Sequence, residues 1–173
     1  LRDAGFGVLL PEYRGYGTNQ GKPNEGGFYA DGRAALRWLA DRGVPAQRTV
    51  LVGNSIGGGT ATQLAIETRP AALILVSAFS SLPDVVAERF VWLPGRWLVK
   101  DQFDNAAKLG RVKAPVLILH GTADDQIPHA HSLRLAKAAP AATLVLIPGT
   151  NHDLAWLPQA KRAEAEWLAG LGL

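Results

Sequence analysis

The 173-residue chain contains no cysteine and no methionine, and only 19% of its residues are charged. Without cysteine it can form neither disulfide bonds nor thiolate metal sites. The absence of cysteine also does not indicate whether the protein works in an oxidising or a reducing compartment. The charged share is below the roughly 25% typical of globular proteins, and 47% of the residues are hydrophobic, so the composition argues against disorder. Because the sequence opens on Leu1 and lacks methionine altogether, we expect it to be the C-terminal part of a longer protein.

Long apolar runs and clusters of basic residues are also missing. The longest mostly apolar run, residues 71–79, is far shorter than the roughly 18 residues that span a membrane. The net charge is +3, but the basic residues are scattered and form no stripe of the kind that follows nucleic-acid phosphates. Nucleic acid is therefore not an expected partner. The length suits one domain of about 150 residues, so residues 1–173 are predicted to form a single domain.

Short apolar runs alternate with helical patterns along the chain. Buried strands are predicted over residues 6–10, 49–52, 73–76, 116–119 and 144–147, and helices over residues 26–42, 60–68, 130–139 and 161–169. No strand alternates apolar and polar residues, which is typical of a mostly parallel sheet with helices on both faces. The alternation breaks over residues 80–110, which carry Phe90, Trp92 and Trp97 and are predicted to be a short lid-like insertion.

The strongest motif is Gly-Asn-Ser-Ile-Gly at residues 53–57, between a predicted strand and a predicted helix. A nucleophilic serine needs a sharp turn that exposes its hydroxyl, and glycines two residues before and after Ser55 would remove crowding Cβ atoms. The N–H of Ile56 lies at a helix N-terminus, which stabilises negative charge. The alternatives are an ordinary glycine-rich turn or a phosphate-binding loop. The phosphate-binding alternative fails because residues 57–60 lack the lysine of a P-loop and residues 15–20 lack the third glycine of a dinucleotide-binding motif.

A nucleophilic serine needs a histidine base, and the base needs an orienting acid. Of the four histidines, His152 follows the last predicted strand, at the edge where doubly wound sheets place their sites. His120 ends the preceding strand and is expected to pack or to hydrogen-bond the loop backbone. His129 and His131 are two residues apart at a helix start, so they point in different directions and form a poor metal pair. No metal site is expected.

The acid is expected after a strand and between the serine and the histidine in the chain. The loop after the strand at residues 116–119 offers two candidates, Asp124 and Asp125. Either can also be a helix-capping or solvated loop acid. The resulting order along the chain is Ser, Asp, His, which distinguishes this arrangement from those of chymotrypsin and subtilisin.

Together these motifs resemble the α/β-hydrolase superfamily. The resemblance is carried by residues 53–59, by the Gly-x-x-Asp-x-x-x-Pro pattern at residues 121–128 and by Asn-His at residues 151–152. The opening residues 5–17 are similar to those of its Bem46/ABHD13-like serine esterase branch. The resemblance implies that Asp124 is the acid, that no cofactor takes part and that the substrate is a small-molecule carboxylic ester or thioester.

The sequence thus predicts an N-terminally incomplete α/β-hydrolase fold with serine esterase chemistry. Ser55 would attack the acyl carbonyl, with His152 as general base and then general acid. Asp124 would orient the imidazole, and the Ile56 N–H would bind the oxyanion. The resemblance implies one further strand beside residues 6–10, whose absence would leave a sheet edge that invites self-association. The alternatives are a serine peptidase of the same fold and a catalytically impaired fragment or binding module.

Overall fold

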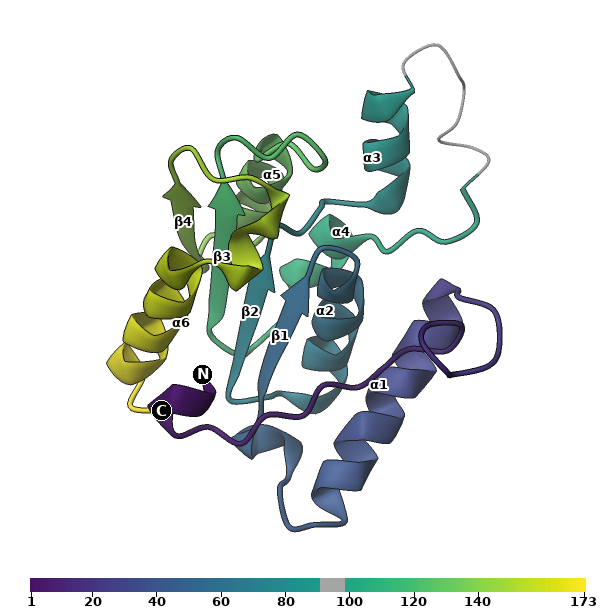
Figure 1. Cartoon of the computed structure of the whole chain (residues 1–173), viewed down its shortest axis with the longest axis vertical. Helices are drawn as coiled ribbons and strands as arrows, with labels where there is room; N and C mark the ends of the chain where they lie inside the picture. Colours follow the sequence, from purple (N-terminus) through teal and green to yellow (C-terminus); the bar gives the residue numbers. More distant parts are fainter. Residues whose placement is uncertain (91–98) are drawn as a thin grey trace.

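The computed structural model describes residues 1–90 and 99–173. Its centre is a parallel sheet in the order β1 (Val50–Asn54), β2 (Ala72–Val76), β3 (Val116–Gly121) and β4 (Thr143–Ile147). The register aligns Val52 with Ile74, Ile74 with Leu117, and Leu117 with Thr143. Since all four strands run the same way (Figure 1), their carboxyl ends and the loops that follow them lie along one edge of the sheet. These four strands confirm the corresponding sequence predictions.

Helices connect the strands and cover them. The described helices are α1 (Glu25–Ala40), α2 (Gly57–Thr68), α3 (Leu82–Arg89), α4 (Asn105–Leu109), α5 (Ala130–Ala138) and α6 (Pro158–Gly170), with short 3-10 helices at Arg2–Ala4, Ala46–Arg48 and His152–Trp156. The Asn24 side chain caps α1 by accepting a hydrogen bond from the Gly27 N–H at 2.8 Å, as expected for an N-cap asparagine. Among the described helices, none combines the length and the apolar character needed to cross a membrane.

The two central strands, β2 and β3, are buried on both faces of the sheet. One core cluster joins the sheet to α2, α4 and α5 through Ala61, Ala65, Leu73, Leu75, Leu109, Ile118 and Leu135. A second cluster joins the opposite face to α6 through Ala72, Ile74, Val76, Leu117, Leu119, Ala160 and Leu168. The strand sequences are continuous apolar runs because successive side chains point to opposite faces of the sheet, and both faces pack against apolar layers. The predicted parallel sheet with helices on both faces is confirmed.

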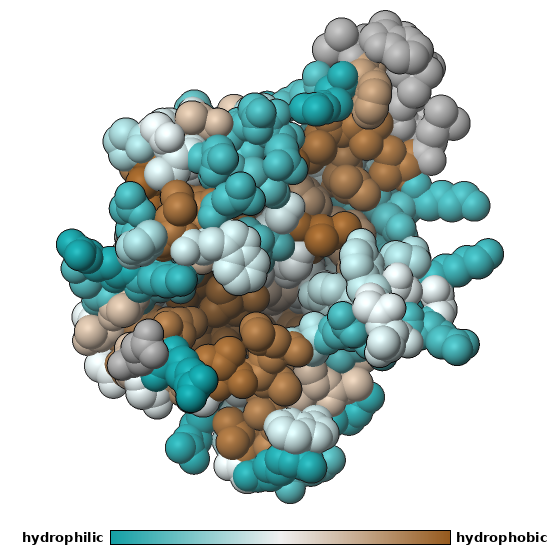
Figure 2. Space-filling view, in the orientation of Figure 1, coloured by the Kyte–Doolittle hydropathy of each residue, from teal (hydrophilic) through white to brown (hydrophobic). Residues whose placement is uncertain are grey.

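The predicted strand at residues 6–10 is wrong. Phe6 packs on the α6 side of the sheet, but Val8 and Leu10 are 54% and 86% exposed. Within the described ranges, β1 pairs with β2 alone, so the sheet ends at β1 and Val52 is 44% exposed. An apolar run becomes a strand only where a neighbour accepts its backbone hydrogen bonds, and residues 6–10 have no such neighbour. Figure 2 shows the apolar surface that remains on this face, in the area that residues 6–10 and β1 cross in Figure 1.

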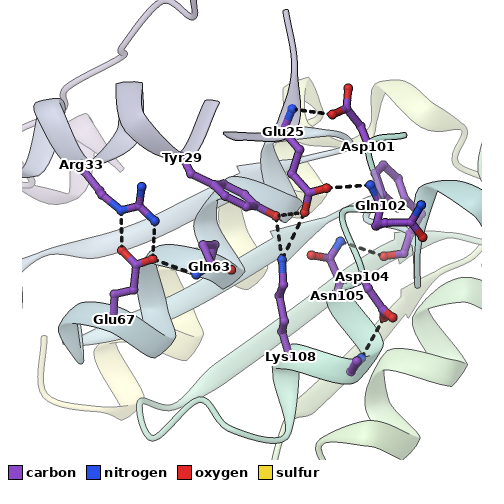
Figure 3. Close-up of polar contacts among 12 residues, drawn as sticks. Glu25, Tyr29, Arg33, Gln63, Glu67, Asp101, Gln102, Asp104, Asn105 and Lys108 are labelled. Carbon is purple, nitrogen blue, oxygen red and sulfur yellow. Dashed lines mark hydrogen bonds and ion pairs between the residues drawn. The ribbon is translucent and has the colours of Figure 1, made fainter. Parts of the chain in front are cut away.

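The segment predicted as an insertion begins with α3 and ends with α4, while Trp92 and Trp97 lie outside the described residues. A polar network ties its returning end to α1 (Figure 3). Glu25 accepts hydrogen bonds from the Gln102 N–H at 2.6 Å and from the Tyr29 hydroxyl at 2.5 Å. The Lys108 ammonium donates to the Tyr29 hydroxyl at 2.7 Å and lies 3.3 Å from Glu25. Residues 101–108 are therefore anchored to α1, whereas the lid-like role of residues 80–110 stays a prediction.

The surroundings shift the pKa values of Tyr29 and Glu25 in opposite directions. Burial raises the pKa of the Tyr29 phenol, and the neighbouring Glu25 carboxylate raises it further. Burial alone would also raise the pKa of Glu25, but hydrogen bonds from Tyr29 and Gln102 outweigh it and lower that pKa overall. The carboxylate therefore stays ionised and holds its donors at neutral pH.

Candidate active site

Ser55 occupies the turn between β1 and α2, as the motif predicts. Its backbone lies in the left-handed region, with a φ of 50°, where a residue with a side chain is strained. Two hydrogen bonds hold this conformation, one from the Ser55 N–H to the Val76 carbonyl at 2.9 Å and one from the Gly58 N–H to the Ser55 carbonyl at 3.0 Å. The turn thus presents the Ser55 hydroxyl at the carboxyl edge of the sheet.

The glycines around Ser55 have unequal roles. A Cβ atom at Gly53 would lie 2.6 Å from the Cα atom of Gly58, so the strand and the helix approach closely only because this position lacks a side chain. At Gly57 an added Cβ would meet nothing nearer than the Tyr13 hydroxyl at 4.0 Å. The expectation that the second glycine also relieves crowding is therefore wrong. The tight contacts on that side belong to the next two glycines: a Cβ would lie 3.0 Å from Ala78 at Gly58 and would overlap the Phe103 ring at Gly59.

His152 joins the two other predicted site residues. Its Nε2 atom lies 3.0 Å from the Ser55 Oγ atom, and its Nδ1 atom lies 2.8 Å from Asp124 Oδ2. The side chain of His152 is 14% exposed and that of Asp124 is fully buried. When the Nδ1–H group donates a hydrogen bond to the carboxylate, Nε2 carries no proton and can accept the proton of the Ser55 hydroxyl. The structure therefore brings Ser55, Asp124 and His152 together, in hydrogen-bonding geometry.

The structure also separates the two acid candidates. Asp125 is exposed, and its backbone carbonyl accepts a hydrogen bond from Arg89 at 3.2 Å. Asp124 points inward, and its Oδ1 atom accepts hydrogen bonds from the backbone N–H groups of Gln126 at 3.0 Å and Ile127 at 2.8 Å. These bonds leave Oδ2 directed at His152. Of the two neighbours, only Asp124 contacts the imidazole.

The loops that carry Asp124 and His152 are bound to each other. The Ala123 N–H donates to the Thr150 carbonyl at 3.0 Å, and the Gly149 N–H donates to the Thr122 hydroxyl at 3.0 Å. These two hydrogen bonds continue the pairing of β3 and β4 into the loops that follow them. The distance between the acid and the imidazole is therefore set by backbone contacts as well as by their own hydrogen bond.

A cavity of about 330 Å³ opens beside the Ser55 hydroxyl and the His152 imidazole. Its lining is supplied largely by α3 and by the loop after β3: Ser55, Val85, Val86, Arg89, Phe90, Gln126, Ile127 and His152. The apolar surface around α3 is visible in Figure 2. Phe90 belongs to the predicted insertion, but α3 was not predicted, although Ser81 followed by Pro83 is a helix-start pattern. Ser81 does accept a hydrogen bond from the Asp84 N–H.

The Ile56 N–H lies directly after Ser55, at the N-cap position of α2. Within residues 1–90 and 99–173 it has no hydrogen-bond acceptor. A helix N-terminus leaves such donors unpaired and carries positive dipole charge, so this group can stabilise negative charge that develops next to Ser55.

Two of the remaining histidines, His120 and His131, are fully buried. The buried His120 contacts the Ile127 carbonyl at 2.8 Å, which confirms that it hydrogen-bonds the loop backbone. His131 is also buried, with Nδ1 2.9 Å from the Ser80 hydroxyl and Nε2 3.3 Å from Glu88. Burial lowers the pKa of both His120 and His131. In the described part of the chain, no three His, Cys, Asp or Glu side chains gather in a way that could hold a metal ion.

Known proteins share this sequence pattern and this fold. Residues 1–107 match a family model described as alpha/beta hydrolase fold. An uncharacterized protein of Mycobacterium tuberculosis is 43% identical over 155 residues, which cover 88% of this chain and 55% of the relative. The alpha/beta hydrolase domain-containing protein aho-3 of Caenorhabditis elegans is 36% identical over 148 residues, which cover 84% of this chain and 43% of the relative.

A solved structure shares the architecture. The monoacylglycerol lipase of Paleococcus ferrophilus superposes with a TM-score of 0.71 at 23% identity, over 98% of this chain and 85% of the lipase chain. The chain described here spans about half the length of the curated relatives it matches. Because the family model covers more than half of its residues, and the observed sheet and helices agree, the chain belongs to the α/β-hydrolase family.

Proposed function

We propose that the protein is a serine hydrolase that cleaves carboxylic esters or thioesters through an acyl-enzyme on Ser55. The observation that carries the proposal is the continuous chain of contacts from the Ser55 hydroxyl through His152 to the buried Asp124, at 3.0 and 2.8 Å. A strained serine at the tip of a strand–helix turn adds support, because that conformation serves nucleophiles. The opening residues 5–17 support the Bem46/ABHD13-like serine esterase branch.

Each residue takes one part in the proposed reaction. His152 Nε2 accepts the hydroxyl proton as the Ser55 oxygen attacks the acyl carbonyl carbon, and Asp124 holds the imidazole by its Nδ1–H. The Ile56 N–H stabilises the negative oxygen of the tetrahedral intermediate. Collapse of that intermediate breaks the bond to the leaving alcohol or thiol, which takes its proton from His152. Water then repeats the sequence and releases the carboxylic acid, leaving Ser55 and His152 as they began.

The cavity supports an apolar acyl group. Val85, Val86 and Phe90 on the α3 side and Ile127 on the opposite loop contribute hydrocarbon surface next to the Ser55 hydroxyl. Burial of an acyl chain against such side chains contributes about 0.8 kcal/mol per methylene group. Esters with an apolar acyl chain should therefore be hydrolysed better than acetyl esters.

Hydrolysis of aryl butyrate and aryl acetate esters tests the proposal, with Ser55→Ala as the matched control. We expect turnover by the wild-type chain and none by the variant. Chelators should have no effect on the rate, because no step of the proposed reaction uses a metal ion. The corresponding butyryl anilide distinguishes the peptidase alternative, since faster cleavage of the amide would favour a peptidase. Equal ester turnover by Ser55→Ala and wild type would refute the proposal.

A further inference from the structure

His120 is fixed at both of its ring nitrogens. The imidazole is fully buried at the end of β3, with Nε2 2.8 Å from the Ile127 carbonyl oxygen and Nδ1 2.5 Å from the Ser132 hydroxyl of α5. A carbonyl oxygen can only accept a hydrogen bond, so Nε2 carries the proton. Nδ1 then accepts the proton of the Ser132 hydroxyl. These two bonds fix one neutral tautomer and one ring orientation.

The same ring edge faces the proposed catalytic acid. His120 Nε2 lies 3.3 Å from Asp124 Oδ2, the oxygen atom that binds His152. Ile127 connects the two residues a second time, because its N–H donates to Asp124 Oδ1 and its carbonyl accepts from His120. A shift of the His120 ring would therefore break its hydrogen bond to the Ile127 carbonyl. It would also move the electropositive Nε2–H edge away from Asp124.

A charged imidazole at this place would compete with His152 for the carboxylate. Burial is the largest influence on the pKa of His120 and lowers it. The hydrogen bond to the Ile127 carbonyl and the nearby Asp124 raise that pKa, while His129 and His152 lower it. The net shift is downward, so the ring stays neutral at pH 7. Its N–H therefore presents a dipole to Asp124 and adds no net charge that would compete with His152 for the carboxylate.

We infer that His120 is a positioning residue that holds the Asp124 carboxylate in the orientation from which it binds His152. The inference rests on the function proposed for Ser55. Packing alone would require only a side chain of suitable size, whereas a positioning role requires the Nε2 donor. The two roles therefore predict different results for an apolar substitution and for a substitution that keeps a donor.

Four variants of the 173-residue chain separate these roles. His120→Leu removes the donor, His120→Gln keeps an amide donor, and Ser132→Ala frees the ring tautomer while leaving the imidazole in place. His129→Gln is the matched control, since the His129 ring makes no hydrogen bond within the described ranges. Two quantities are measured: the rate constant for labelling of Ser55 by a fluorophosphonate, and the low-field proton resonance of His152 Nδ1–H, which reports its bond to Asp124.

We expect His120→Leu to lower the labelling rate about 10- to 100-fold, as a misplaced catalytic group does, and to abolish the low-field resonance. His120→Gln should recover most of the rate, His129→Gln should match wild type, and Ser132→Ala should lose about 5-fold. Wild-type labelling and an intact resonance in His120→Leu would overturn the inference. Should His120→Leu fail to fold, wild-type values for both quantities in Ser132→Ala would overturn it instead. Absence of labelling in the wild type would count against the proposed function, while the resonance would still decide the role of His120.

Discussion

The Nε2 atom of His152 lies 3.0 Å from the hydroxyl oxygen of Ser55, although 97 positions separate the two residues in the chain. Ser55 follows β1 and His152 follows β4, which are the two outer strands of the sheet. The loop after β4 therefore reaches back over the end of β3 to bring the imidazole to the serine. This path explains why the loop is bound to its neighbour at Ala123 and why Gly121, below it, has no side chain.

The choice of acid can be tested by two neighbouring substitutions. Asp124→Asn should lower ester hydrolysis about 10⁴-fold, because the amide no longer favours the imidazole tautomer that activates the serine. Asp125→Asn is the matched control and should stay near wild type, since the Asp125 side chain is exposed and only its backbone carbonyl is bound. Steady-state turnover of an aryl ester measures both. A larger loss in Asp125→Asn than in Asp124→Asn would contradict the assignment.

The crossing of the β4 loop over β3 predicts a strong effect of Gly121→Ala. A Cβ atom there would overlap the Thr150 carbonyl oxygen, so the loop that carries His152 must move. We expect a loss of about 1–3 kcal/mol in the free energy of unfolding, as for other overpacked positions, together with a large loss of turnover. Urea unfolding and ester hydrolysis measure the two effects.

Gly170→Ala is the control for that substitution, because nothing lies within 4 Å of the added Cβ and the residue is in the last turn of α6. Its free energy of unfolding should stay unchanged or rise by up to about 1 kcal/mol. Equal stability and equal turnover in Gly121→Ala and Gly170→Ala would show that the β4 loop is not held as described.

The buried histidines predict a loss of stability in mild acid. Burial lowers the pKa of His120 and His131, whereas in the unfolded chain both imidazoles titrate near pH 6.5. Between the folded and unfolded pKa values the unfolded chain binds more protons, so the free energy of unfolding rises with pH there. The free energy of unfolding should have its full value above about pH 6.5 and should decline as the pH falls below it.

Urea unfolding at about pH 7.5 and about pH 5.5 measures this decline. The double variant His120→Gln, His131→Gln should lose less stability between the two conditions, because glutamine does not titrate. A wild-type chain that is as stable at the lower pH as at the higher one would contradict the assignment of buried, neutral imidazoles.

The exposed edge of β1 predicts self-association. Val52 is 44% exposed on a strand that pairs with β2 alone within the described ranges, and unpaired strand edges recruit other strands. We propose that the chain forms concentration-dependent oligomers and that Val52→Lys reduces them. Leu133→Lys, at an equally exposed apolar residue on α5, should have no such effect. Sedimentation velocity over a concentration series measures the association, and a monomer at every concentration would contradict the proposal.

The parts of the fold that depend on local sequence could be predicted. The strands at β1 to β4 are short apolar runs bounded by glycine, proline or polar residues, and α1 carries its own Asn24 cap. The strand predicted at residues 6–10 failed because pairing depends on a neighbour, which no local pattern reveals. The helix α3 was not predicted because it has only eight residues, too few for its apolar periodicity to stand out in the sequence.

Residue types and their order along the chain were enough to predict part of the candidate site. Ser55 and His152 follow from a glycine-rich turn and from the position after the last strand. Asp124 and Asp125 are equivalent in the sequence, and only the turn that binds Asp124 Oδ1 to the Gln126 and Ile127 N–H groups separates them. The approach of His120 to Asp124 depends on side-chain orientation beyond the end of β3, so no spacing rule could have shown it.

The proposed reaction requires Ser55 to be an activated nucleophile. Intact mass spectrometry of the 173-residue chain after prolonged exposure to a fluorophosphonate, followed by peptide mapping, tests this requirement. We expect one phosphonyl adduct per chain, located on Ser55 and absent from Ser55→Ala. An unmodified wild-type chain, or the same adduct in the Ser55→Ala variant, would contradict it.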